Sequence, residues 1–256
     1  TYALASGVSN GTLTFNANGS YSYTPNGNYS GPDSFTYTVT DAASGESLTQ
    51  TVSLTVNPIS DTPTRAASAV SGDEDSPIAL NIASALTDTD GSETLSIRLD
   101  NIPVGAVLSN TAGDILTISG GSIVLTPDQL AGLAITPPAN SHADFNLSVT
   151  AIAVDGSAAP ASTATTLAVT VNPVTDLSAA NDSASTDEDV PVINASVAGN
   201  DSTTSGGSLT YALASGVSNG TLTFNSDGSY SYTPNGNYSG PDSFTYTVTD
   251  ATSGES

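Results

Sequence analysis

The stretch NGTLTFNANGSYSYTPNGNYSGPDSFTYTVTD, residues 10–41, decides the fold of this chain. Apolar and hydroxyl-bearing residues alternate within it, most plainly over Phe35–Val39. Such alternation places apolar side chains on one face of an extended strand and polar side chains on the other. Asn18-Gly19 separates the runs Thr12–Phe15 and Ser20–Thr24, and Asn-Gly is the dipeptide preferred in tight β-hairpin turns. The stretch therefore predicts antiparallel strands.

The same alternation recurs further along the chain, in Val52–Val56 and Leu167–Val171. Short strands separated by Gly, Pro, Asn and Asp are typical of β-sandwich domains. The segment DQLAGL, which begins at Asp128 after Pro127, predicts a single short helical turn. We expect no long helix, and an all-β chain of tandem sandwich domains arranged end to end.

The chain contains a long internal repeat, because Thr1–Ser47 returns almost unchanged as Thr210–Ser256. The two copies differ at three positions, where Ala17, Asn18 and Ala43 are replaced by Ser226, Asp227 and Thr252. The offset of 209 residues is far longer than one repeat of a solenoid protein. It indicates a repeating pair of domains.

Two similar strands indicate where the domains end within the repeat: TVSLTVNP at 51–58 and TLAVTVNP at 166–173. Each is expected to be the last strand of a domain. The predicted parts are the C-terminal piece of a sandwich (1–57), a complete sandwich (58–172) and a sandwich that lacks its last strand (173–256).

Two interpretations of the missing strand remain open. The segment is either cut from a longer array, or strand Leu48–Val56 of one chain completes the domain 173–256 of another by strand addition. The second arrangement would build a head-to-tail filament.

The charge balance is strongly acidic, with two basic residues, Arg65 and Arg98, against 25 acidic ones and a net charge of −23. Phosphate binding requires clustered basic residues, so nucleic acid and anionic membrane are excluded as partners. A chain this negative repels itself when compact. Bound divalent cations would relieve that repulsion, which points to an extracellular setting.

Cysteine is absent, so disulfides and thiolate chemistry contribute nothing to stability or function. No apolar run approaches the roughly 20 residues that a membrane-spanning helix needs. No signal peptide begins the chain, and Thr1 is expected to lie inside a longer protein.

Acidic residues gather at positions that an Ig-type sandwich topology would bring to the domain boundaries, because alternate loops lie at opposite ends of a sandwich. The first boundary is expected to collect Asn57, Asp61, Asp88, Asp90 and Asp155. The second is expected to collect Glu74, Asp144, Asn172, Asp176, Asp201 and Asp250. Ca²⁺ takes six to eight oxygen ligands at about 2.3–2.6 Å in irregular geometry, so both boundaries predict Ca²⁺ sites. The alternative is ordinary Asp-containing turns.

The sequence offers little support for a catalytic site. The only histidine, His142, has no nucleophile motif to act with, and the paired carboxylates lie at turns rather than in an aromatic-lined cleft. Zinc would need Cys and His ligands that the chain lacks. The tyrosines suggest either a sugar-stacking platform or, as we expect, strand positions in the core or at its rim: Tyr21, Tyr23, Tyr29 and Tyr37.

Two segments carry a resemblance to a known group of proteins. LTDTDGSETLSIRLDNIPVGAVLS (86–109) with LTPDQLAGLAITPPANS (125–141) resembles the Ig-like extender repeats of bacterial RTX-type adhesins. AANDSASTDEDVPV (179–192) with residues 219–250 resembles the related cadherin-like, or VCBS-type, tandem repeats. The resemblance implies an extracellular, Ca²⁺-stiffened stalk on the bacterial surface.

By this resemblance, metal-binding roles are assigned to six acidic residues: Glu74, Asp88, Asp90, Asp155, Glu188 and Asp250. Two departures from the pattern stand out. Asn200-Asp201-Ser202 replaces the Asp88-Thr89-Asp90 pattern, and the glycine-rich nonapeptide of RTX proteins is absent.

The expected function is therefore a non-catalytic extender that binds Ca²⁺ and contacts neighbouring repeats of the same protein. Two alternatives stay open: a self-assembling extracellular filament in which copies join head to tail, and a carbohydrate- or cell-binding module. No nucleic acid and no membrane insertion is expected.

Overall fold

The computed structural model describes all 256 residues, and its regular secondary structure is almost wholly β-strand. The single helix is a short 3-10 turn, η1 (Pro127–Leu130), which confirms the helical turn expected after Pro127. No helix has the length and apolar character needed to cross a membrane. The expected all-β class is confirmed.

The chain divides into two compact units. The first comprises residues 1–71, 77–136 and 144–170, and the second comprises residues 72–76, 137–143 and 171–256. The boundaries expected near residues 57 and 172 stay a prediction.

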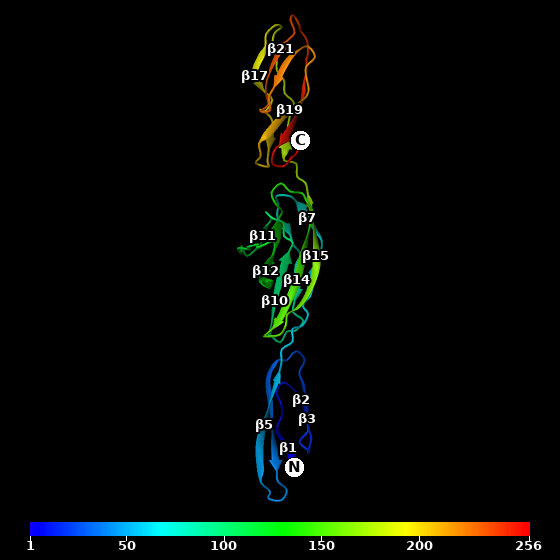
Figure 1. Ribbon diagram of the computed structural model, residues 1–256, viewed down its shortest axis with the longest axis vertical. Coiled ribbons are helices and arrows are strands. Elements are labelled where there is room, and N and C mark those ends of the chain that lie inside the picture. The colour runs from blue at the N-terminus through cyan, green and yellow to red at the C-terminus, as the bar shows by residue number, and fades with distance from the viewer. The chain divides into compact units, whose positions relative to one another are not determined.

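The N-terminal residues of the first unit form five antiparallel strands: β1 (Tyr2–Ser6), β2 (Gly11–Phe15), β3 (Tyr21–Pro25), β4 (Gly31–Thr40) and β5 (Ser47–Val56). Strand β4 lies between β1 and β5 in one sheet, while β2 and β3 form a hairpin (Figure 1). The hairpin turn is the predicted Asn18-Gly19, where Gly19 adopts a φ of 85° that favours glycine.

Asp33 fastens the start of β4 to the connection between β1 and β2. Its carboxylate accepts hydrogen bonds from the backbone N–H of Ser9 at 3.0 Å and of Asn10 at 2.9 Å, and from the Tyr23 hydroxyl at 3.1 Å. The Ser9 N–H contributes most to holding the pKa of Asp33 below its usual value. The second copy repeats the arrangement at Asp242, with Ser218, Asn219 and Tyr232 as donors.

The remaining strands of the first unit are β6 (Thr64–Ala67), β7 (Val70–Asp73), β8 (Ile78–Ala79), β9 (Ile82–Ala85), β10 (Glu93–Asp100), β11 (Val107–Ser109), β12 (Ile123–Leu125), β13 (Ala134–Thr136), β14 (Phe145–Asp155) and β15 (Ala161–Asn172). Five of them form one sheet in the order β12-β10-β14-β15-β7, and three form another in the order β11-β13-β8. Strands β10, β14 and β15 lie side by side in Figure 1. Strand β6 pairs with β9.

The core of this unit follows from the alternation along the strands. Ile97 and Leu99 on β10 are buried together with Leu147 and Val149 on β14, whereas the residues between them face outward. Leu167 on β15 adds to the same buried layer. Burial of aliphatic side chains on one face of a sheet is the main source of stability in such a domain.

The second unit contains β16 (Leu177–Ser178), β17 (Val192–Ser196), β18 (Ser202–Thr203), β19 (Leu209–Ser215), β20 (Gly220–Phe224), β21 (Ser229–Pro234) and β22 (Thr245–Asp250). The sheets have the orders β17-β21-β20, β19-β22 and β16-β18. Val197, Tyr211, Tyr230 and Val248 form the buried core.

The two copies of the repeat bury different side chains. Tyr230 is 8 % exposed, whereas its counterpart Tyr21 is 46 % exposed. In the second copy β21 pairs with β17, and in the first copy β4 pairs with β5 and buries Phe35. Of the other first-copy tyrosines, Tyr23 is half-buried, in keeping with a position at the rim.

Replacing Ile97, which is fully buried, by alanine should lower the free energy of unfolding by about 2–5 kcal/mol, because a cavity remains in a packed sheet. The matched control is Val104→Ala, at a position 96 % exposed, which should change stability by no more than about 0.5 kcal/mol. Denaturant unfolding followed by circular dichroism measures both. Equal effects would contradict the assignment of the core.

Replacing Asp33 by asparagine should destabilise the chain at neutral pH, because an amide cannot accept all the hydrogen bonds made by the carboxylate. The lowered pKa means that the charged form stabilises the fold above the unfolded-state value of 3.8, and that this contribution is lost as pH falls through the lower folded-state pKa. The difference in melting temperature between the parent and the Asp33→Asn variant should therefore shrink on acidification. The control Asp128→Asn, whose carboxylate accepts no hydrogen bond, should show no such pH-dependent difference.

Candidate metal centre

Strand pairing brings Asp61 opposite Asp88. Strands β6 and β9 pair with Thr64 opposite Ala85, and continuing this antiparallel register by three residues on each strand places Asp61 against Asp88. A hydrogen bond of 3.1 Å from the Thr87 hydroxyl to the Thr62 carbonyl holds the two segments together. The pairing of β6 with β9 therefore positions both Asp61, in the linker before β6, and Asp88, in the loop after β9.

Glu93 adds a third carboxylate to this pair. It is the first residue of β10, and its Oε1 accepts a hydrogen bond of 2.6 Å from the backbone N–H of Asp61. Its Oε2 atom is buried and has no hydrogen-bond partner. A buried carboxylate oxygen without a partner carries a large desolvation cost, which a bound cation would offset.

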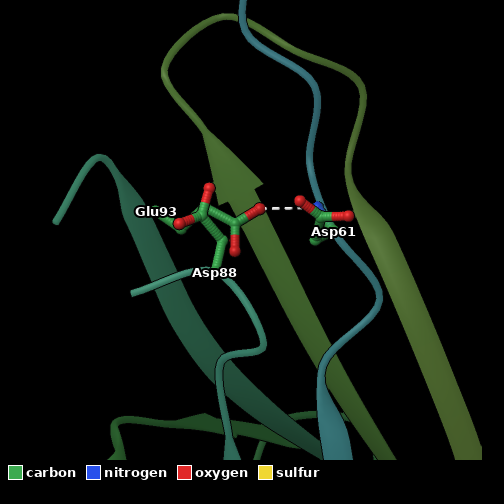
Figure 2. A group of neighbouring side chains, drawn as sticks. All are labelled: Asp61, Asp88 and Glu93. Atoms are coloured by element: carbon green, nitrogen blue, oxygen red, sulfur yellow. Dashed lines mark hydrogen bonds between the residues drawn. The ribbon is translucent and has the colours of Figure 1, made fainter. Parts of the chain in front are cut away.

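The carboxylate oxygens of Asp61, Asp88 and Glu93 lie within 4.8 Å of one another. Figure 2 shows the three side chains converging from the linker, the loop after β9 and the start of β10. Asp88 is 2 % exposed and Glu93 is 8 % exposed. No basic side chain forms an ion pair with any of the three.

Two of the other residues predicted for this boundary lie near the group. Asp155 is buried and is the last residue of β14, directly opposite Glu93 in the ladder. Its backbone N–H donates to the Ser60 hydroxyl at 2.9 Å, which ties the linker to β14. Asp90 is exposed, and Ser92 donates two hydrogen bonds to its Oδ1, which lowers its pKa.

Asp90 therefore organises its own loop and does not join the three converging carboxylates. Asn57 is exposed, and its predicted role as a ligand stays a prediction. Glu93 was absent from the sequence prediction, although it ends the acidic run Asp88–Glu93 that drew attention to the loop. Its position at the start of β10 could have been anticipated from the strand pattern, but its approach to Asp61 could not.

A second set of acidic residues lies in the second unit. Glu74 is 4 % exposed; its Oε1 accepts a hydrogen bond of 2.9 Å from the Val174 N–H, and its Oε2 is buried without a partner. The Glu74 N–H donates to the Asn172 carbonyl at 3.0 Å. His142 Nδ1 lies 3.9 Å from Glu74 Oε1.

Asp176 resembles Glu74, because one of its carboxylate oxygens is hydrogen-bonded and the other is buried without a partner. Its Oδ1 accepts a hydrogen bond of 2.6 Å from the Thr204 hydroxyl, and its Oδ2 is buried without a partner. Its N–H donates to Glu255 Oε2 at 2.8 Å, so Glu255, which was also absent from the prediction, positions it. Glu74, Asp176 and Thr204 line the same hollow of this unit.

Asp250, the last residue of β22, is fully buried. Its Oδ2 accepts hydrogen bonds from the hydroxyls of Thr203 and Ser205, and its Oδ1 from the Thr252 N–H. The Ser205 hydroxyl contributes most to lowering the pKa of Asp250 to about 2. The carboxylate is therefore anionic, and its hydrogen bonds are supplied by its own loop, by the end of β18 and by the segment that follows β18.

The remaining predicted residues lie in other surroundings. Asp201 accepts a hydrogen bond from the Ala180 N–H, and its Oδ2 is buried without a partner. Burial, followed by the Asp201 charge, raises the pKa of Tyr211. Glu188 is exposed in the turn Asp187–Asp189. Asp144 immediately precedes β14.

Comparisons with known proteins complete the description. The bacterial cadherin-like domain family matches residues 1–58 and 172–256. No curated protein matches the chain. Among solved structures, the protocadherin GammaB4 extracellular domain is 14 % identical with a TM-score of 0.37, and covers 98 % of this chain and 41 % of its own.

Two further solved structures match with similarly low sequence identity and TM-score. Drosophila N-cadherin EC1-4 is 17 % identical with a TM-score of 0.31, covering 99 % of this chain and 64 % of its own. The endo-fucoidan hydrolase MfFcnA4 of glycoside hydrolase family 107 is 17 % identical with a TM-score of 0.21, covering 98 % and 37 %. This chain spans 41 % and 51 % of the length of the first two protocadherin structures it matches.

Cadherin-like domains are extracellular modules with adhesive or structural roles, and the fold is typically non-catalytic. The family match covers both copies of the internal repeat and more than half of the chain. The protein therefore belongs to the bacterial cadherin-like domain family.

Proposed function

We propose that the chain is a Ca²⁺-stiffened extender segment of a large secreted bacterial surface adhesin, without catalytic activity. The observation that carries the proposal is the convergence of Asp61, Asp88 and Glu93, with one buried Glu93 oxygen left without a partner. Family membership supports an extracellular structural or adhesive role.

The residues present fit Ca²⁺ in their chemistry. All three converging groups are carboxylates, which are the hard oxygen ligands that Ca²⁺ prefers over nitrogen and sulfur. Asp155, buried opposite Glu93, is available to extend the set. The absence of cysteine and the exposure of the only histidine argue against a site built for a softer metal.

Electrostatics supports a cation at this position. Three carboxylates within 4.8 Å repel one another, and the repulsion is stronger for buried groups because water screens them poorly. A divalent ion would supply the positive charge that the chain itself lacks, since its formal net charge is −23.

The proposed mechanism of stiffening works through the linker. Asp61 lies in the segment between β5 and β6, while Asp88 and Glu93 belong to the following sandwich. A cation held by all three would fix the linker to the loop after β9 in addition to the existing bond from the Asp61 N–H to Glu93. Fewer linker conformations would then be accessible.

A second site is proposed around Glu74 and Asp176. Each has a buried carboxylate oxygen without a partner, and both line one hollow. Val174 and Asn172, which bond to Glu74, belong to the segment that precedes β16. Binding there would restrain the segment Asn172–Asp176 as the first site restrains the linker before β6.

The proposed organisation consists of cadherin-like parts at 1–57 and 173–256 on either side of an Ig-like sandwich at 58–172. The partners of the chain are then neighbouring repeats of the same protein, at the bacterial cell surface. Near-identity of the copies at Thr1–Ser47 and Thr210–Ser256 supports a spacing role, because duplication changes length without creating a private binding site.

Calcium titration of the intact chain by isothermal calorimetry should show saturable binding with a Kd of about 10⁻⁴–10⁻³ M, as in other extracellular Ca²⁺ modules. Asp88→Asn and Glu93→Gln should each weaken binding to the first site by about tenfold or more, because affinity depends on the number of charged ligands. The melting temperature should rise with Ca²⁺ in the parent chain, since the ion binds only the folded state.

The matched control for these variants is Asp227→Asn. It removes the same charge, and the other copy of the repeat already has Asn18 at this hairpin turn with the same hydrogen bonds to the following serine. Unchanged binding is expected for the control. Weakening as large as that of Asp88→Asn would mean that total charge, rather than a site, governs the uptake of Ca²⁺.

Small-angle scattering provides a test of stiffening that is separate from binding. Adding Ca²⁺ to the chelator-treated chain should narrow the distribution of interatomic distances, because the linker before β6 loses freedom. The Glu93→Gln variant should respond less than Asp227→Asn at the same Ca²⁺ concentration. Tight binding without any change in scattering would reject the mechanical role while leaving the metal site intact.

A further inference from the structure

Five Asn-Gly dipeptides occur in the chain: Asn10-Gly11, Asn18-Gly19, Asn26-Gly27, Asn219-Gly220 and Asn235-Gly236. Glycine has no Cβ to shield its backbone nitrogen and moves freely. That nitrogen can therefore approach the side-chain amide carbon of the preceding asparagine. By sequence the five dipeptides are equivalent, but their surroundings in the structure are not.

At Asn18 both the side-chain amide and the N–H of the following glycine are hydrogen-bonded. The Asn18 Oδ1 atom accepts hydrogen bonds from the Ser20 N–H at 3.0 Å and the Ser20 hydroxyl at 2.7 Å. The Gly19 N–H donates to the Asn16 carbonyl at 2.9 Å. Attack by the Gly19 nitrogen would require breaking these bonds together, so this turn is protected.

Asn10 and Asn219 are held at the ends of hairpins. The Asn10 N–H is bound by Asp33 at 2.9 Å, and its carbonyl accepts from the Asn26 N–H at 2.9 Å. Gly11 begins β2, and a Cβ added to it would lie 2.5 Å from the Thr24 carbonyl oxygen. Asn219 and Gly220 repeat this enclosure, so neither dipeptide has room to rearrange.

Asn26 and Asn235 differ from the other three. Both asparagines are exposed, and neither side chain makes a hydrogen bond. The N–H groups of Gly27 and Gly236 donate no hydrogen bond, and nothing lies within 4 Å of a Cβ placed on either glycine. The backbone of each asparagine is held in a turn by hydrogen bonds of its N–H and C=O groups, but the attacking glycine nitrogen and the side-chain amide carbon are both accessible and free of hydrogen bonds.

We propose that Asn26 and Asn235 are sites of spontaneous deamidation. The glycine nitrogen forms a bond to the asparagine Cγ, the Cγ–Nδ2 bond breaks, and ammonia leaves with the proton taken from the glycine nitrogen. Water then opens the cyclic imide at either carbonyl and yields aspartate or isoaspartate. Each event adds one negative charge, and the isoaspartate product adds one atom to the backbone path.

The Asp189 carboxylate should slow the reaction at Asn235. The Asn237 N–H donates to the Asp189 carboxylate at 2.8 Å, which restrains the loop that contains Asn235. The Asp189 charge also disfavours the anionic nitrogen that attacks in the first step. Removing this carboxylate should therefore speed the reaction at Asn235.

Deamidation at Asn235 would affect the acidic turn Asp187–Asp189, because Asp189 accepts a hydrogen bond from the loop that contains Asn235. An aspartate formed at Asn235 would increase the negative charge beside three exposed carboxylates. The loop would then change slowly with age, without any enzyme and without a change in the gene.

The test is incubation of the folded chain at mildly alkaline pH, followed by proteolysis and mass spectrometry, with isoaspartyl methyltransferase labelling to locate isoaspartate. Asn26 and Asn235 should each deamidate severalfold faster than Asn18, Asn10 and Asn219. In concentrated urea all five should react at comparable rates, because the protection comes from the fold.

Two variants sharpen the test. Gly27→Ala should slow the reaction at Asn26 alone, and it should fold normally because no atom lies near the added methyl group. Asp189→Gly, which suits the φ of 64° at that position, should raise the rate at Asn235 above its rate in the parent chain. Reaction at Asn18 as fast as at Asn26 in the folded chain would overturn the proposal. An unchanged Asn235 rate in Asp189→Gly would overturn the assigned role of Asp189.

Discussion

Mutual repulsion among buried carboxylates is the constraint on which the candidate site depends. Asp88 and Glu93 are withdrawn from water, yet the chain offers no basic side chain to pair with them. Buried anions are ordinarily paired or bound to metal, because desolvation is costly. The unpartnered oxygen of Glu93 is where this imbalance is most evident. The hard divalent cation of the proposed function would offset it with the residues already in place.

The backbone ladders determine where these charges meet. The pairing of β6 with β9 brings Asp61 to Asp88, and the pairing of β10 with β14 brings Glu93 to Asp155. Each contact joins residues remote in sequence through strands whose register is set by buried apolar faces. Stability of the sandwich core and formation of the site are therefore coupled: a slip of one residue in either ladder would separate the carboxylates.

The duplicated segment makes the same local hydrogen bonds in both copies. Asp33 and Asp242 accept from equivalent donors, because those donors lie within the copied residues. Asn18 and Asp227 likewise accept from the serine two residues further on. The Asn-Gly dipeptides follow the same rule, since hydrogen bonds made by neighbouring residues within the copy decide which of them are engaged.

The amino-acid sequence alone determined the all-β class, the hairpin at Asn18-Gly19, the helical turn after Pro127 and the acidic loop around Asp88, because alternation, turn chemistry and charge are local properties. It also indicated that Asp155 ends a strand beside that loop. The tertiary structure was needed to show that Glu93 approaches Asp61 and that Asp90 bonds within its own loop. Those outcomes depend on strand register and on which side-chain oxygens remain unpaired after packing, and neither is encoded in any short stretch of residues.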